Sequence, residues 1–329
     1  MIKLLWRTDV HMADRTPQSR KDDWTTTVLG KLTQVGALAK AYGVNAVIDG
    51  GDFFHQKSPG QTSAQTLVKV AKVHNEYPCP VYCCVGNHDC VYGDIAYLDQ
   101  QPLGVLFEAG VFQRLYDDHT VTFHDSSSPT GTLSVRVVGI PYHGVLYDLD
   151  RFRAVKKGDE DYLVVVAHVL ASKQGGSMFE GEDILKYDFL ESCEGDIFAF
   201  GHWHKDQGIT QLPTGQWVIN IGSLTRGSLS QDHMKRSPAV AIMEFCPTNG
   251  ITIHRHDLNV VPANEIFDVA AKVKQEVRTL VVKEFVGSLK DMLQKTGQVP
   301  IVDKIRDDKN IPSAIKEKAI LYWENSQKS

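Results

Sequence analysis

The chain has 329 residues, of which 42% are hydrophobic, and its 35 basic and 40 acidic side chains give a formal net charge of −5. The apolar fraction excludes wholesale disorder, and the acidic balance argues weakly against a protein that clamps DNA by charge alone. The longest apolar run, residues 162–171, contains His168 and is shorter than the roughly 18 residues of a membrane span, so we expect no membrane segment.

The first part of the chain alternates between short apolar runs rich in β-branched residues and helix-like segments. Strands are predicted over residues 3–8, 44–49 and 81–85, and helices over residues 25–42 and 66–73. Strand–helix–strand order with continuous apolar strands is typical of parallel strands buried on both faces. We therefore predict a largely parallel sheet here.

More strands are predicted further along, over residues 133–140, 162–167, 196–200 and 217–221. Residues 238–245 and 251–256 flank Asn249-Gly250, a pair that predicts a hairpin with a type I′ turn. We place all of these elements in one α/β domain over residues 1–258.

The character of the chain changes after Asn259. Apolar residues recur at helical spacing over residues 265–293, and Pro312-Ser313 is a helix-start signal for a segment that reaches residue 325. We predict that residues 259–329 form a small helical C-terminal region.

Side chains that bind metals follow the predicted strands. In open α/β sheets, ligands gather outside the carboxyl ends of the strands, so these separate residues are expected to converge. The candidate metal ligands are Asp9, His11, Asp52, Asn87, His168, His202 and His204.

The donor atoms of this set indicate the kind of metal. Two carboxylates, one amide oxygen and several imidazoles, with no thiolate, favour Mn²⁺, Fe²⁺, Zn²⁺ or Mg²⁺ over a structural zinc site. Seven ligands are too many for one catalytic ion that keeps an open position. We therefore predict two divalent ions bridged by one carboxylate.

The order of the motifs resembles one known family. Asp-x-His, Gly-Asp-x-x-His, Gly-Asn-His-Asp, a lone strand-end His and Gly-His-x-His look like the calcineurin-like metallophosphoesterase superfamily. Gly50-Gly51-Asp52-Phe53-Phe54-His55 and the segment 220–226 are similar to its SbcD branch, the bacterial and phage nucleases that process DNA ends. The compact tail looks more like the phage versions. The implied fold is a four-layer α/β/β/α sandwich of two mixed sheets.

The resemblance assigns each predicted ligand to an ion. It places one ion on Asp9, His11, Asp52 and His204, and the other on Asp52, Asn87, His168 and His202, with Asp52 as the bridge. Mn²⁺ is the ion that the resemblance favours most.

The resemblance also implies three catalytic residues. His88 would face the substrate phosphate, Asp89 would orient the His88 ring, and His55 would position the DNA end. Ser/Thr phosphatases of the superfamily instead carry Asp-Arg-Gly after the second motif, where this chain has His55-Gln56-Lys57, which argues against a phosphoprotein phosphatase.

The implied activity is that of a dimetal-dependent DNA nuclease in repair, recombination or replication. It would act as an exonuclease on ends, with endonuclease activity on single strands, together with an SbcC-like ATPase of the SMC type; a homodimer is compatible with this reading. Residues 259–329 are short for a capping domain plus an ATPase-binding element, so we interpret them as a reduced cap that docks the partner or simply packs on the core. The alternatives are a phosphodiesterase for small nucleotides or other phosphodiesters and a non-catalytic scaffold on this fold.

Basic residues in or beside the motif loops are candidates for contacts with DNA phosphates, and each of them could equally be an ordinary solvated charge. They are Arg20, Lys21, Lys57, Lys205, Arg226, Lys235 and Arg236.

The start of the chain and its cysteines bear on the compartment. The apolar part of residues 1–7 is too short for a signal peptide. Four of the six cysteines crowd residues 79–90, where we expect reduced thiols and no zinc site, since no Cys-x-x-Cys is present. We expect a cytoplasmic protein.

Overall fold

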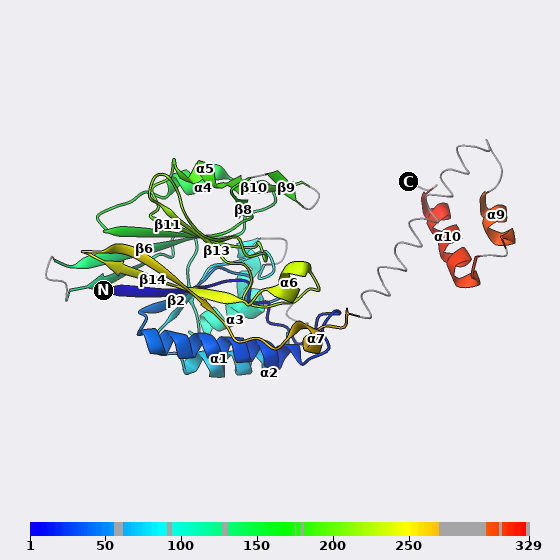
Figure 1. The fold of residues 1–329 in the computed structure, drawn as a ribbon, viewed down its shortest axis with the longest axis horizontal. Helices are drawn as coiled ribbons and strands as arrows, with labels where there is room; N and C mark the ends of the chain where they lie inside the picture. The colour runs from blue at the N-terminus through cyan, green and yellow to red at the C-terminus, as the bar shows by residue number, and fades with distance from the viewer. Residues whose placement is uncertain are drawn as a thin grey trace. The chain divides into compact units, whose positions relative to one another are not determined.

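The computed structural model describes residues 1–55, 62–90, 94–126, 131–174, 176–178, 181–269, 301–308 and 311–326 (Figure 1). The chain divides into two compact units, Met1–Val269 and Ala270–Ser329. All of the predicted site residues belong to the larger unit.

The first sheet of the larger unit has the strand order β15-β14-β1-β2-β3-β4. Strands β1 to β4 are parallel to one another, whereas β14 pairs antiparallel with β1 and β15 pairs antiparallel with β14. The strands are β1 (Ile2–Arg7), β2 (Ala46–Asp49), β3 (Val81–Cys83), β4 (Gln113–Arg114), β14 (Ala239–Cys246) and β15 (Gly250–Asp257).

The second sheet has the order β12-β13-β11-β7-β6-β5, again with four parallel strands in the middle and an antiparallel strand at each edge. Its strands are β5 (Val121–Asp125), β6 (Leu133–Ile140), β7 (Tyr162–His168), β11 (Ile197–Gly201), β12 (Gly208–Gln211) and β13 (Trp217–Asn220). A small third sheet contains β8 (Ala171–Ser172), β9 (Gly176–Met178) and β10 (Glu182–Lys186).

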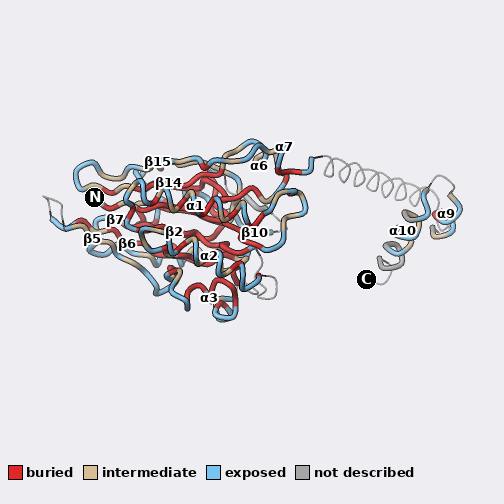
Figure 2. The backbone as a smooth tube through the Cα atoms, turned by 90° about the horizontal axis from the view of Figure 1, so that it is seen from below, coloured by how far each residue is buried: buried red, intermediate tan, exposed pale blue. Residues whose placement is uncertain are grey.

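The two large sheets face each other across a buried apolar layer, seen as the red interior of Figure 2. Trp6 and Ile48 of the first sheet meet Val164 and Ala199 of the second in this layer. The helices are α1 (Trp24–Tyr42), α2 (Ala64–Asn75), η3 (Ile95–Gln100), α3 (Pro102–Glu108), α4 (Leu149–Ala154), α5 (Tyr187–Leu190), α6 (Gln231–Lys235) and α7 (Ala263–Ile266).

Helices cover the outer face of each sheet. Apolar residues of α1, α2 and α3 form one cluster with β1 and β2, and residues of α4 and α5 form another with β7 and β11. The predicted α/β/β/α sandwich with two mixed sheets is therefore confirmed.

Helix α1 shows how local sequence sets these boundaries. The Asp23 side chain accepts a hydrogen bond from the Thr26 backbone N–H, which caps the helix start. Gly43 ends the helix with φ 59°, a left-handed conformation that glycine adopts without steric cost, and its N–H bonds the carbonyls of Ala39 and Lys40.

The hairpin between β14 and β15 corrects one sequence prediction. Cys246 pairs with Gly250, so three residues form the loop, and of the loop and its closing pair only Gly250 has positive φ, at 72°. A type I′ turn requires two central residues with positive φ. The Asn249-Gly250 prediction of that turn was wrong because Pro247 and Thr248 belong to the loop as well.

The junction between the two units also differs from the predicted helix over residues 265–293. Phe267 is extended after the short helix α7 and forms a β-bridge with Arg20. Ile266 and Phe267 pack with Leu229 within the larger unit. Residues 270–293 lie outside the described residues.

The second unit contains α9 (Ile301–Asp307) and α10 (Ser313–Ser326), which contact each other. Helix α10 begins directly after Pro312, as predicted from the helix-start signal. None of the described helices is long and apolar enough to cross a membrane.

A buried polar cluster supports the end of β1. Arg7 donates from Nε to Asp49 Oδ2 at 2.7 Å, and both side chains are fully buried. Its other nitrogens meet the Tyr77 hydroxyl at 3.1 Å and His74 Nε2 at 3.0 Å. Asp49 Oδ1 accepts from the Gly51 backbone N–H at 3.1 Å, so the cluster also holds the turn that leads to Asp52.

His74 in this cluster predicts an acid-sensitive step in stability. Burial and the Arg7 charge hold the pKa of His74 well below its usual value, so the unfolded chain binds an extra proton below about pH 6.5. The stability present above that pH is lost as the pH falls, by up to about 1.4 kcal/mol per pH unit for this residue.

We expect the free energy of unfolding of His74→Gln, measured in urea without added metal, to fall less steeply than that of the wild type below about pH 6.5. The difference in slope should be up to about 1.4 kcal/mol per pH unit. A glutamine can keep both hydrogen bonds, to the Val70 carbonyl and from Arg7, and does not titrate. The exposed His119→Gln serves as control and should leave the slope unchanged. An unchanged slope in His74→Gln would contradict the assignment.

Candidate metal centre

The predicted ligands follow the carboxyl ends of strands in both sheets. Strands β1, β2 and β3 of the first sheet, and β7 and β11 of the second, all run toward this edge of the sandwich. Because the two sheets face each other, side chains that are far apart in sequence meet here.

The first group of potential ligands contains Asp9, His11, Asp52 and His204, whose donor atoms all lie within 4.8 Å of one another. His11 Nε2 is 3.8 Å from both Asp9 Oδ1 and Asp52 Oδ2. His204 Nε2 is 3.5 Å from Asp9 Oδ1 and 2.8 Å from His11 Nε2. Burial and the charge of His204 lower the pKa of His11 to about 4, so a neutral His11 can offer a lone pair at pH 7.

The second group contains Asp52, His168 and His202, again within 4.8 Å. His168 Nε2 is 3.4 Å from Asp52 Oδ1 and 3.3 Å from Asn87 Oδ1. Asp52 therefore belongs to both groups, with Oδ2 toward His11 and Oδ1 toward His168. This is the position that a bridging carboxylate requires.

The electrostatics of these groups fit a cation. Asp52 Oδ2 is buried and accepts no hydrogen bond from any residue that the structure describes, an uncommon state for a carboxylate oxygen. Burial opposes the charge on Asp52, but the nearby His168 holds the pKa of that carboxylate below its usual range. Burial likewise opposes the charge on His168, and Asp52 nonetheless raises the pKa of His168 to about 10. The buried carboxylates thus draw positive charge into the space that a divalent ion fits.

The backbone is strained at the same residues. Among the described non-glycine residues only five have positive φ, and four of these are predicted ligands: Asp9 at 54°, His11 at 52°, Asp52 at 52° and His202 at 84°. Such conformations each cost of the order of 1–3 kcal/mol and persist where surrounding contacts enforce them, commonly at functional sites.

Glycines allow the turns to approach one another. A Cβ on Gly86 would overlap the Asp52 carboxylate, and one on Gly201 would overlap Thr8 Oγ1. These two positions therefore require glycine because the backbone itself lines the cluster.

Hydrogen bonds around the groups orient the donor atoms. His168 donates from Nδ1 to the Gly50 carbonyl at 2.8 Å, which leaves Nε2 as the nitrogen that faces Asp52 and Asn87. Thr8 donates from Oγ1 to Asp9 Oδ2 at 2.7 Å.

Glu182 on β10 orients His202 in the same way. Its Oε1 accepts a hydrogen bond from His202 Nε2 at 2.8 Å and from the Tyr147 hydroxyl at 3.0 Å. The Tyr147 oxygen in turn accepts from the Leu170 backbone N–H at 2.9 Å. With the proton on Nε2, His202 presents Nδ1 as its free lone pair, and this fixes the tautomer for metal binding.

We expect Glu182→Ala to weaken Mn²⁺ binding about 10- to 100-fold, because His202 loses the carboxylate that fixes its tautomer. Isothermal titration calorimetry of the full chain measures this directly. Glu191→Gln, an exposed carboxylate nearby in sequence, is the control and should bind Mn²⁺ like the wild type. Equal Mn²⁺ affinity in Glu182→Ala and the wild type would rule out the orienting role.

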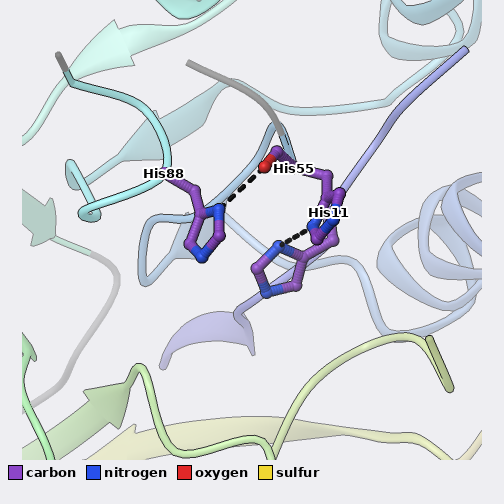
Figure 3. Close-up of side chains that lie close together, drawn as sticks. All are labelled: His11, His55 and His88. Carbon is purple, nitrogen blue, oxygen red and sulfur yellow. Dashed lines mark hydrogen bonds between the residues drawn. The ribbon is translucent and has the colours of Figure 1, made fainter. Parts of the chain in front are cut away.

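A third group consists of His11, His55 and His88 at the edge of the first group (Figure 3). His88 donates from Nδ1 to the His55 carbonyl at 2.7 Å, and its ring stacks on the His55 ring with centroids 5.3 Å apart. His55 Nδ1 lies 3.4 Å from His11 Nδ1. The bond at Nδ1 leaves His88 Nε2 as the nitrogen with which to meet a substrate.

Asp89 does not orient the His88 ring, contrary to the sequence expectation. Its buried carboxylate accepts hydrogen bonds from the backbone N–H groups of Gly86 at 3.0 Å, Phe54 at 3.1 Å and Phe53 at 3.4 Å. Asp89 thus ties the turn after β3 to the turn after β2, and the His55 carbonyl orients His88. Burial and the charge of Asp52 raise the pKa of Asp89 to about 8.

The structure adds neighbours that sequence reasoning missed. Tyr142 places its ring 5.5 Å from that of His202, and Glu182 and Tyr147 support the same histidine. No motif marks Glu182, which lies on the short strand β10 between β7 and β11. Trp203 packs against the apolar cluster on the outer face of the second sheet.

Comparisons with known proteins identify similar sequences and structures. The chain is 24% identical over 263 residues to the DNA double-strand break repair protein Mre11 of Halobacterium salinarum. The match covers 79% of this chain and 61% of that relative, so the chain spans less than two thirds of the relative's length.

Solved structures with similar folds include an archaeal phosphodiesterase (TM-score 0.38, 14% identity), a dimetal phosphatase from Danio rerio (0.48, 13%) and the protein TT1561 of Thermus thermophilus (0.44, 11%). Each covers 78% of this chain, and the match spans 99–100% of the other chain. The family model described as calcineurin-like phosphoesterase matches residues 2–206, more than half of the sequence, and the chain therefore belongs to the calcineurin-like phosphoesterase family.

Proposed function

We propose that this protein is a DNA nuclease that hydrolyses phosphodiester bonds with two divalent metal ions, in the cell Mn²⁺. The observation that carries the proposal is the pair of ligand groups that share Asp52, with His88 beside them. Asp9, His11 and His204 would hold one ion with Asp52, and Asn87, His168 and His202 would hold the other. When bound, two such ions supply Lewis-acid activation and neutralise charge on the phosphodiester.

The chain's own residues have separate tasks in this proposal. His88 would hydrogen-bond the scissile phosphate through Nε2 and donate the Nε2 proton to the leaving oxygen, while its Nδ1–H remains hydrogen-bonded to the His55 carbonyl. His55, which is exposed and stacked on His88, would contact the DNA end. Asp89 would hold the turn after β3 against the turn after β2 through its hydrogen bonds to the backbone of Gly86 and Phe54.

The choice of DNA rests on the similarity to an Mre11 protein and on the SbcD-like motifs. The same similarity supports a partner ATPase of the SbcC type, for which α9 and α10 are the candidate docking elements. A globally acidic chain would hold DNA weakly by itself, which favours a partner that adds DNA affinity.

The test compares two substrates. Purified chain with Mn²⁺ should degrade linear duplex DNA, and EDTA should abolish the activity. Bis(p-nitrophenyl) phosphate measures phosphodiester hydrolysis without any demand on DNA binding.

Each outcome selects one interpretation. Cleavage of the small phosphodiester with intact DNA, even with an ATPase partner present, would reject the nuclease and leave a phosphodiesterase for small substrates. No cleavage of either substrate by metal-loaded protein would reject catalysis and favour a scaffold.

A further inference from the structure

A basic cavity lies beside α1, away from the ligand groups. The segment between β15 and α7 runs along α1 (Figure 1), and a cavity of about 140 Å³ remains between them. This volume holds several water molecules, at about 30 Å³ each. Three of its lining residues are basic: Arg20, Lys31 and Arg226.

These cations are buried, in contrast to the surface contacts that the sequence suggested for Arg20 and Arg226. Lys31 is 7% exposed, and Arg20 and Arg226 are 7% and 6% exposed. Thr26 and Gly30 on α1 also line the cavity and are exposed, so it opens to solvent beside them.

Only one of the three cations has a carboxylate partner among the described residues. Arg20 pairs with Asp22 through Nε at 2.7 Å. Lys31 donates to the backbone carbonyl of Asn259, and Arg226 donates to that of Val261 at 2.5 Å. Carbonyl groups carry no net charge, so two positive charges at the cavity remain uncompensated.

Buried positive charges without a compensating negative charge are energetically unfavourable. Burial and the nearby Arg226 and Arg20 charges lower the pKa of Lys31 to about 8, which shows how strongly the site disfavours a third cation. No Asp or Glu side chain lines the cavity within the described part of the chain. An anion would compensate these charges and accept charge-assisted hydrogen bonds from them.

We propose that this cavity binds a phosphoryl anion, held by Lys31 and Arg226 with Arg20 behind them. The proposal goes beyond the nuclease activity and does not depend on it. The anion could be free inorganic phosphate or a phosphate of a nucleic-acid backbone, since both present the same charged oxygens.

The cavity lies close to one of the predicted metal ligands, which is relevant to a phosphate that belongs to nucleic acid. The Arg20 guanidinium lies over the Trp24 ring at 5.0 Å, and Trp24 Nε1 donates to the His11 carbonyl at 3.0 Å. One indole therefore separates the cavity from the backbone of a predicted ligand. A DNA strand that crosses the metal centre could leave one of its phosphates here.

The experiment is a calorimetric titration of inorganic phosphate into the full chain, with Mn²⁺ and without it. Phosphate bound at the metal centre should require Mn²⁺, whereas phosphate bound in the cavity should not. Lys31→Met should weaken the metal-independent binding about tenfold or more, because a charge-assisted hydrogen bond is lost. Lys31→Arg should restore most of it, which separates lost charge from a fold defect.

Lys40→Met, at the exposed end of the same helix, is the matched control and should bind phosphate like the wild type. His88→Ala should likewise keep the metal-independent phosphate site, so this result is independent of the proposed catalysis. Equal metal-independent binding by the wild type and Lys31→Met, or none by the wild type, would overturn the proposal.

A second arm distinguishes the two sources. A short duplex oligonucleotide is titrated into wild type and Lys31→Met, with and without competing inorganic phosphate. Loss of oligonucleotide affinity in Lys31→Met assigns the cavity to a backbone phosphate. Equal oligonucleotide affinity, with phosphate binding lost, assigns it to free phosphate.

Discussion

Replacing His88 with alanine should lower the rate of Mn²⁺-dependent DNA cleavage by about 10²- to 10⁴-fold, the usual contribution of a general acid. The His88 side chain donates a hydrogen bond to the His55 carbonyl, and its ring lies beside the ligand groups. Mn²⁺ affinity should therefore stay within a few-fold of the wild type. Single-turnover cleavage of linear duplex DNA and calorimetry with Mn²⁺ measure the two quantities.

His119→Ala is the control for this experiment, because His119 is exposed and far from the ligand groups in sequence. It should cleave DNA at the wild-type rate. A His88→Ala protein that binds Mn²⁺ normally and cleaves DNA within about tenfold of the wild type would show that His88 is not the proton donor.

Replacing Arg7 with methionine should destabilise the fold by about 3–5 kcal/mol, which is a large share of the stability of a protein domain. The substitution leaves the fully buried Asp49 carboxylate without its cation, and Tyr77 and His74 also lose a partner. Urea unfolding of the metal-free chain gives the free energy of unfolding directly.

An exposed ion pair supplies the matched control. Arg153 and Asp150 are 2.8 Å apart, and their side chains are 54% and 82% exposed. Arg153→Met should cost no more than about 1 kcal/mol. If Arg7→Met were equally mild, the buried pair would not support β1 in the way we infer.

The position of the site at the ends of parallel strands explains why several of its residues could be predicted from sequence. Asp9 lies two residues after β1, Asp52 lies three residues after β2, and His168 is the last residue of β7. Parallel strands place their carboxyl ends at one edge of a sheet. Convergence then follows from the alternation of strands and helices, which is visible in the residue pattern. The roles of these residues as metal ligands remain predictions.

The contacts of Asp89 and Glu182 could not be predicted in this way. Asp89 is adjacent to His88 in sequence, yet its carboxylate turns to the backbone of Phe53 and Phe54 across the site. Glu182 contacts His202 from a small third sheet that no periodic sequence pattern predicted. Both contacts join segments that are distant in sequence, and the periodicity of a sequence does not predict which distant segment a side chain will meet.

Charge shows the same difference between what the sequence predicts and what the tertiary structure determines. The net charge of −5 is a property of the whole sequence, and it correctly describes a chain without an overall basic surplus. It says nothing about Arg20 and Arg226, which the fold buries in one cavity with Lys31. Burial of a charge depends on which segment covers it, here residues 259–266.

The sequence by itself predicted the family, most of the strands in the two large sheets and the residues that gather at the ends of these strands, because periodicity and motif spacing are local properties. Only the tertiary structure decided that the His55 carbonyl orients His88, that Glu182 contacts His202, and which cations share a cavity. These contacts join segments that are tens to hundreds of residues apart. Their geometry is set by the packing of two sheets against each other, which no local pattern encodes.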